Sequence, residues 1–287
     1  MTIREADRKI LNALETAREQ RAELAGLLAF YHELYEVQFR AKAALAEPDP
    51  SCVEMGVVDA PSRRLRLDEG HPQVTVDELS LQPEAFARLV MEVSAVLLRH
   101  DPAWEIRWQD WTPDRLVARA RQSLASSDAL ALHGLEAQNG PQTEHRQEHA
   151  VALSVGFALA PYLQWSAEAI LPLLDLTIWV HGTCPICGGR PDLAMLEKER
   201  GARQLLCSRC NSLWDYTRVG CPFCRSKQKQ NYFVSDDGVY RLYVCPDCRR
   251  YLKTVDLREL QRPVIPVVER LLTAGMDVAA RQQGYGG

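Results

Sequence analysis

The segments CPICGGRP at 184–191, LLCSRCNSLWDYTRVGCPFC at 205–224 and VCPDCRRYLK at 244–253 contain eight of the nine cysteines of this chain. The eight form four C-x2-C pairs: Cys184/Cys187, Cys207/Cys210, Cys221/Cys224 and Cys245/Cys248. Two such pairs separated by about 15–20 residues have the spacing of a four-thiolate metal site. Because this pattern occurs twice in succession, the sequence predicts two metal sites.

The order of the pairs along the chain suggests which cysteines act together. The spacers 188–206 and 225–244 separate the pairs within each set, and their similar length suits a short antiparallel hairpin. We therefore expect one site from Cys184, Cys187, Cys207 and Cys210, and a second from Cys221, Cys224, Cys245 and Cys248. The short segment 211–220 between the two sets also permits an interleaved arrangement, which the repeat described next disfavours.

An internal repeat underlies the two sets. Cys184 and Cys221 are 37 residues apart, and Cys207 and Cys245 are 38 apart. Each unit contains CPxC, a hairpin-like stretch, and CxxC followed by an aromatic residue, Trp214 or Tyr251. The turn signal Asp236-Asp237-Gly238 lies between two β-prone segments of the second unit.

The remainder of the chain is predicted to be mostly helical, so the expected fold class is α+β. Apolar spacing and proline positions predict helices near 24–45, 82–100 and 112–124, and an apolar helix, continuous or broken at Pro161 and Pro172, reaching about 180. Residues 52–76 are expected to be loop, and 264–283 one amphipathic helix. The expected domains are a helical domain at 1–180, four-cysteine modules at 181–220 and 221–258, and a C-terminal helix and tail at 259–287.

Composition and charge narrow the class of protein. The net charge is −4, but residues 181–260 carry 14 Lys and Arg against 9 Asp and Glu, so the cysteine-rich part is mildly basic. The N-terminal sequence lacks the apolar core of a secretory signal, and the apolar run 150–163 is too short to cross a bilayer. We therefore expect a cytoplasmic protein without membrane insertion, in which paired cysteines bind metal rather than form disulfides.

The donor set limits what the predicted sites can do. Four thiolates bind zinc in a closed structural site, and they also bind a single iron ion, so ligand type leaves the metal open. Four cysteine ligands leave no open coordination position, so we expect no hydrolytic catalysis at either metal. The segment 145–149 matches H-x-x-E-H, an inverted zinc-peptidase pattern, but we interpret it as the polar first turn of a helix.

The cysteine region resembles the FdhE family, formate dehydrogenase accessory proteins. The resemblance lies in the four C-x2-C pairs, Trp214 after the second pair, Arg218-Val219 before Cys221, and Tyr251-Leu252-Lys253 after the last pair. It implies a helical domain followed by two rubredoxin-like modules that contain iron. It also implies a cytoplasmic protein that binds the catalytic subunit of a respiratory formate dehydrogenase during maturation, and therefore no enzyme activity of its own.

Two other functions are compatible with the residues. A zinc-ribbon protein that binds nucleic acid fits the mildly basic 181–260 segment, although the acidic helical part disfavours it and no nucleic-acid partner is expected. A rubredoxin-like electron carrier fits two iron–tetrathiolate sites, although a pure carrier has little need of a helical part as long as 1–180. The sequence leaves the homo-oligomeric state open.

Overall fold

The computed structural model describes residues 2–45, 60–75, 78–79, 81–104, 106–125, 143–228 and 231–286. Two compact units are formed, one by residues 1–57 and 74–169, the other by 58–73 and 170–287. The helical domain expected at 1–180 is therefore interrupted, because 58–73 and 170–180 group with the cysteine modules. The expected α+β class, with helices followed by tandem four-cysteine modules, is confirmed.

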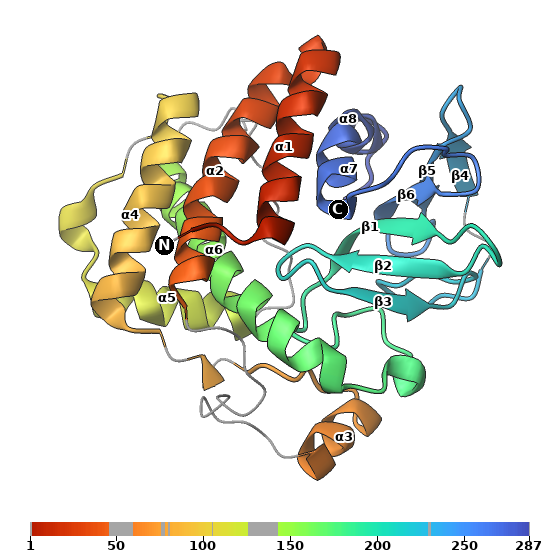
Figure 1. Cartoon of the computed structure of the whole chain (residues 1–287), viewed down its shortest axis with the longest axis horizontal. Helices are drawn as coiled ribbons and strands as arrows, with labels where there is room; N and C mark the ends of the chain where they lie inside the picture. Colours follow the sequence, from red (N-terminus) through yellow and green to blue (C-terminus); the bar gives the residue numbers. More distant parts are fainter. Residues whose placement is uncertain are drawn as a thin grey trace. The chain divides into compact units, whose positions relative to one another are not determined.

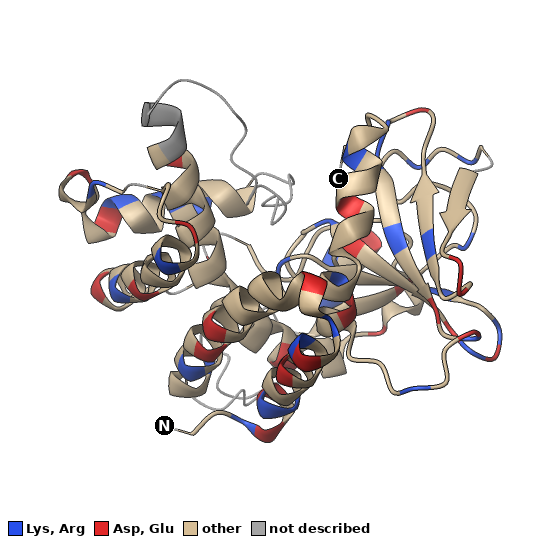
Figure 2. Cartoon of the chain, turned by 90° about the horizontal axis from the view of Figure 1, so that it is seen from above, with Lys and Arg blue, Asp and Glu red and all other residues tan. Residues whose placement is uncertain are grey.

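The first unit is built from helices alone in its described residues (Figure 1). They are α1 (Glu5–Gln20), η1 (Ala22–Leu24), α2 (Ala25–Ala44), α4 (Pro83–His100), η3 (Trp108–Asp110), α5 (Pro113–Ala125) and α6 (Thr143–Ile170). Pro83 and Pro113 each occupy the first helical position, where a missing N–H costs nothing. Acidic and basic residues are interspersed along these helices (Figure 2), and Glu5 and Lys9 form an ion pair on α1.

Helix α6 runs without a break through Pro161. A proline at this position cannot donate to the carbonyl of Phe157, four residues earlier. The side chain of Gln38 on α2 supplies the missing donor, with its Nε2 2.8 Å from the oxygen of Phe157. The helix is long and apolar enough to cross a membrane, but most of it is buried inside the protein, as expected of a core helix.

An ion cluster around buried Lys42 joins three helices of the first unit. Lys42 on α2 contacts Asp7 on α1 at 2.6 Å and Glu168 on α6 at 2.7 Å. Arg4 also contacts Glu168, at 2.6 Å. Because Lys42 is almost fully buried, two carboxylates are needed to offset the loss of its hydration.

The second unit contains a six-stranded sheet in the order β3-β2-β1-β6-β5-β4. The strands are β1 (Pro191–Leu196), β2 (Arg203–Cys207), β3 (Leu213–Tyr216), β4 (Asn231–Val234), β5 (Tyr240–Val244) and β6 (Tyr251–Asp256). Each module contributes a three-stranded antiparallel meander, and β1 pairs with β6 in parallel, with Leu193 opposite Lys253. The two modules therefore repeat in the same orientation within one sheet.

Short helices complete the second unit. They are α3 (Ala60–Asp68), η4 (Leu171–Leu173), η5 (Leu176–Ile178), α7 (Pro266–Leu272) and α8 (Ala274–Gln282). Two expectations were wrong: α3 lies within the stretch expected to be loop, and the C-terminal helix is divided at Thr273. Thr273 leaves helical geometry while its hydroxyl donates back to the carbonyl of Glu269 at 2.8 Å.

Candidate metal centres

All four C-x2-C segments adopt the same local fold, a knuckle. In each knuckle the N–H of the first cysteine donates to the carbonyl five residues later, at 2.8–2.9 Å. The residue after the second cysteine has a positive φ: Gly188 (68°), Asn211 (61°), Arg225 (60°) and Arg249 (56°). Glycine and asparagine tolerate this left-handed conformation, whereas arginine adopts it at some cost. The knuckles therefore turn the chain sharply enough to bring two sulfurs together.

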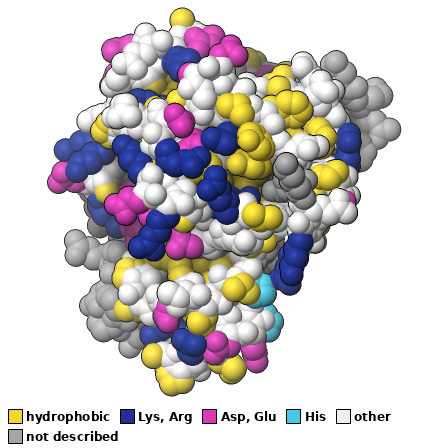
Figure 3. Space-filling model, turned by 90° about the vertical axis from the view of Figure 1, so that its right-hand side faces the viewer, with side chains coloured by type: hydrophobic (Ala, Val, Ile, Leu, Met, Phe, Trp, Pro, Cys, Tyr) yellow, Lys and Arg dark blue, Asp and Glu magenta, His cyan; other side chains and the backbone are white. Residues whose placement is uncertain are grey.

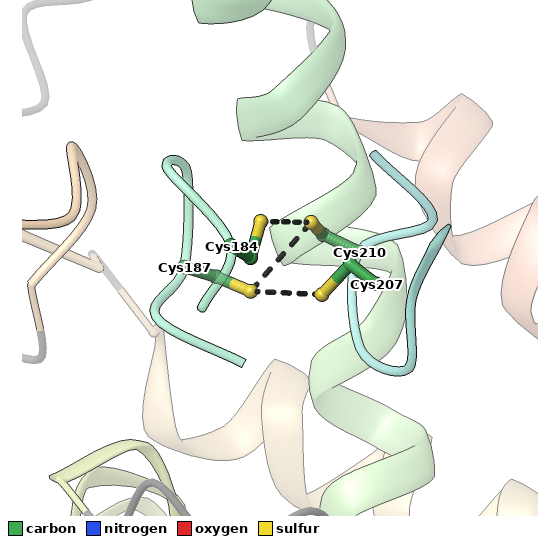
Figure 4. Close-up of side chains that lie close together, drawn as sticks. All are labelled: Cys184, Cys187, Cys207 and Cys210. Atoms are coloured by element: carbon green, nitrogen blue, oxygen red, sulfur yellow. Dashed lines mark hydrogen bonds between the residues drawn. The ribbon is translucent and has the colours of Figure 1, made fainter. Parts of the chain in front are cut away.

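The first predicted set converges at one point, named site 1 here: Cys184, Cys187, Cys207 and Cys210 (Figure 4). Its sulfurs lie 3.5 Å apart for Cys184 and Cys210, 3.5 Å for Cys187 and Cys207, and 3.6 Å for Cys187 and Cys210. All four residues are buried, at 4% exposure or less. Backbone N–H groups of Ile186 and Arg209 each donate to a sulfur at 3.4 Å, which stabilises negative charge on it.

The second predicted set also converges, at site 2: Cys221, Cys224, Cys245 and Cys248. The sulfurs of Cys221 and Cys248 are 3.7 Å apart, as are those of Cys224 and Cys245. Cys221 and Cys245 are buried, but Cys248 is only partly buried and Cys224 is exposed. The two sites therefore share a donor set and differ in their access to solvent.

These geometries fit a tetrahedral metal ion. Metal–sulfur bonds of about 2.3 Å place the corners of a tetrahedron about 3.8 Å apart, close to the sulfur separations at both sites. Burial raises the pKa of the Cys184 thiol, and the neighbouring Cys187 thiol raises it further. Burial also raises the pKa of Cys248, to about 11. Against the effect of burial, hydrogen bonds from neighbouring groups lower the pKa of Cys207 in site 1 and of Cys245 in site 2, so charge is shared unevenly within each group. Four adjacent thiolates repel one another unless a cation offsets their charge, and each group can hold one ion.

The cysteines group in chain order, as expected from the repeat, rather than in the interleaved arrangement. That these eight residues bind metal stays a prediction. No disulfide is formed by the eight, whose thiols are all free. The ninth cysteine, Cys52, lies outside the described residues.

The sequence did not reveal the residues outside the first module that form hydrogen bonds to the two knuckles of site 1. Arg270 on α7 donates through Nη2 to the carbonyl of Cys207 at 2.7 Å and through Nη1 to Asn211 at 2.8 Å. On the other knuckle, the N–H of Gln73 donates to the carbonyl of Pro185 at 2.9 Å. Both partners come from distant parts of the chain, one before the modules and one after them, so no spacing rule identifies them.

A second group of unpredicted residues holds the modules and the C-terminal helices together. Lys253 on β6 is fully buried, and its Nζ donates to Asp277 on α8 at 2.6 Å and to the carbonyl of Arg270 at 3.0 Å. Buried Arg203 donates to the carbonyl of Gly220 at 2.8 Å, in the segment that links the two modules. The burial of such charged residues could not be predicted from the sequence. A charge is buried only when it has a partner, and here the partners come from distant segments.

His181, three residues before Cys184, lies outside both cysteine groups. Its Nδ1 lies 2.6 Å from Nη2 of Arg225, its ring packs on Trp179, and its carbonyl accepts from Trp214 Nε1 at 3.1 Å. Partial burial lowers the pKa of His181, and the charge of Arg225 lowers it further. The residue therefore connects the segment before site 1 to a knuckle of site 2.

The described residues do not support a peptidase site at the H-x-x-E-H segment, 145–149. The side chain of His145 lies outside the described residues, and His149 stacks on Trp104 with ring centroids 5.5 Å apart. Among the described residues, the two cysteine sets are the only groups of three or more His, Cys, Asp and Glu side chains close enough to share an ion.

The structure thus defines a class of protein in which a helical unit accompanies tandem four-cysteine modules joined in one sheet. A family model described as the FdhE central domain matches residues 183–218, which contain all of site 1. An FdhE homologue from Aquifex aeolicus is 24% identical over 283 residues, covering 96% of this chain and 90% of that protein. An FdhE homologue from Pseudomonas aeruginosa is 29% identical over 209 residues, covering 62% and 64%. The chain is thus similar to FdhE homologues over most of its length, and to the FdhE central domain at site 1.

The fold is also similar to that of a solved structure. A crystal structure of the FdhE protein from Pseudomonas aeruginosa superimposes with a TM-score of 0.55, at 19% sequence identity. The likeness covers 91% of this chain and 86% of that one. It therefore extends well beyond the cysteine modules, into the helical unit.

Proposed function

We propose that this chain is an accessory protein for the maturation of a respiratory formate dehydrogenase. In this proposal it binds the catalytic subunit in the cytoplasm and catalyses no reaction itself. The observation that carries the proposal is the match of site 1 and its surroundings to the FdhE central domain. The extension of the likeness across both units supports a role for the whole chain.

The two metal ions have a structural part in this proposal. Each ion joins the two knuckles of one module and holds the meander between them in place. The six-stranded sheet thereby becomes a rigid surface to which the catalytic subunit can bind. Four thiolates saturate a tetrahedral ion, which favours a scaffold over catalysis at the metal. Iron is the favoured ion, from the resemblance stated above, and zinc fits the same donors.

A binding experiment in cells tests the proposal. The full-length chain, carrying an affinity tag, is isolated from cells that express formate dehydrogenase, and the catalytic subunit is measured in the eluate. We expect capture by the wild-type chain and strongly reduced capture by the double variant Cys184→Ser/Cys221→Ser, with Arg200→Gln in the exposed β1–β2 turn as the matched control. Absence of capture, together with normal formate oxidation in a deletion strain, would exclude the proposal.

A rubredoxin-like electron carrier is the second candidate, because exposed Cys224 brings site 2 to the protein surface. This function requires a reversible one-electron change with a measurable potential. Nucleic-acid binding has less support. On the face in Figure 3, Lys and Arg gather in a band that also contains Asp and Glu, whereas phosphate binding favours an uninterrupted cationic surface.

A further inference from the structure

The two sites differ in how completely the protein encloses them. Every cysteine of site 1 is buried, and both of its knuckles are covered by distant segments of the same unit. The ring of Pro72 lies 3.4 Å from the position a Cβ would take on Gly188, and Arg270 covers the other knuckle. An ion at site 1 is thus out of reach of a molecule in solution.

Site 2 has an open side. Gly182 packs so closely on Pro222 that an added Cβ would lie 1.9 Å from the carbonyl oxygen of Pro222. This contact covers the start of the knuckle and the buried Cys221, but Cys224 at its end stays exposed. Cys221 and Cys245 are buried and Cys248 is partly buried. Cys224 is therefore the cysteine of site 2 that an outside ligand can most easily replace.

The cations nearest to the two sites differ in exposure. Arg209 and Arg270 at site 1 are buried, whereas Arg225 and Arg249 at site 2 are exposed. In the first module the residues that follow the second cysteines include Gly188, Asn211 and Ser212, all neutral. At the equivalent positions the second module has Arg225, Arg249 and Arg250. Arg250 lies over the ring of Phe223, between the two cysteines of the exposed knuckle, at 5.6 Å. Site 2 therefore has three arginines beside it and one carboxylate, that of Asp247, so exposed positive charge predominates there and attracts an anionic donor.

We propose that site 2 is a ligand-exchange centre, at which a thiolate from outside the chain replaces Cys224 on the metal. The inference rests on the metal sites of the proposed function. In the exchange, a bond forms between the metal and the incoming sulfur, and the bond between the metal and Sγ of Cys224 breaks. The incoming thiol releases its proton to solvent, and the departing Cys224 thiolate takes up a proton. No oxidation state changes.

Metal release from the purified full-length chain tests this directly. The chain is loaded with Zn²⁺, and transfer to a coloured chelator is followed with and without glutathione. We expect two ions per chain, one released at least about tenfold faster than the other, with glutathione accelerating only the fast one. The fast ion must be absent from Cys221→Ser and present in Cys184→Ser.

Two further variants separate exchange from simple instability of site 2. Arg225→Gly/Arg250→Ser gives the second module the residues of the first, and it should lose most of the acceleration by glutathione while still binding two ions. Arg200→Gln serves as the control with unchanged acceleration. Equal release of both ions, or a fast ion that belongs to site 1, overturns this inference and leaves the proposed function intact. A chain that binds no metal overturns both.

Discussion

Arg270 on α7 donates a hydrogen bond to the carbonyl of Cys207 at 2.7 Å, which joins the C-terminal helices to the second knuckle of site 1. The same guanidinium contacts Asp192 at 2.7 Å, so it spans the knuckle and β1. A site formed by residues 184–210 is therefore held in place by a residue from the far end of the chain. The geometry of site 1 depends on the C-terminal helix as well as on its own cysteines.

We predict that Arg270→Gln accelerates metal loss from site 1 about tenfold, because the knuckle carbonyl and Asn211 lose their buried donors. Metal loss from site 2 should stay unchanged. Chelator competition on the zinc-loaded chain measures both rates, and Arg200→Gln is the matched control. An equal effect on both sites would contradict the assigned role.

Gly182 allows the segment before site 1 to approach the first knuckle of site 2. We predict that Gly182→Ala lowers the free energy of unfolding by about 1–3 kcal/mol, because a Cβ there would collide with the backbone of Pro222. Gly275→Ala in α8 is the control, since a Cβ there meets nothing within 4 Å. Chemical denaturation compares the two, and equal stability of both variants would contradict the close approach.

Gln38 and Pro161 form a testable pair in the helical unit. Gln38→Leu should cost about 1–3 kcal/mol, because the carbonyl of Phe157 loses its buried donor. Pro161→Ala restores a helical N–H to that carbonyl, so the double variant should recover most of the loss. A double-mutant cycle by chemical denaturation measures the coupling, and additive effects would disprove the pairing.

Lys253 and Asp277 form a buried ion pair between the sheet and α8. Lys253→Met should destabilise the chain by about 3–5 kcal/mol, since Asp277 is left buried without its cation. The double variant Lys253→Met/Asp277→Asn removes the uncompensated charge and should be more stable than the single variant. Thermal unfolding at fixed metal loading distinguishes the two, and a neutral Lys253→Met would count against the pair.

The features predicted from the sequence depend on local signals. The C-x2-C spacing determines each knuckle, and the internal repeat of the two modules indicates which knuckles belong together. Pro83 and Pro113 mark helix starts that the structure places at the same residues. Such signals act within one turn or one hairpin, so they can be read from a single chain.

The features that sequence reasoning missed depend on distant contacts. The parallel pairing of β1 with β6 joins the first and last strands of the sheet in chain order. Nothing in the sequence of either strand indicates that the two pair. Helix α3 has only two leucines and was expected to be loop. Its segment groups with the second unit through contacts such as Gln73 with Pro185, which are far apart in the sequence. The burial of Lys253 and Arg203 likewise follows from the assembled sheet.

The central claim is that the chain holds two separate tetrathiolate ions, with cysteines paired in chain order. Metal content per chain, measured together with X-ray absorption at the metal edge, tests it most directly. The wild type should contain two ions, each with four sulfur neighbours at about 2.3 Å, and Cys184→Ser and Cys221→Ser should each retain one fully sulfur-ligated ion. Loss of both ions from either variant, or nitrogen or oxygen ligands in the wild type, would contradict the account.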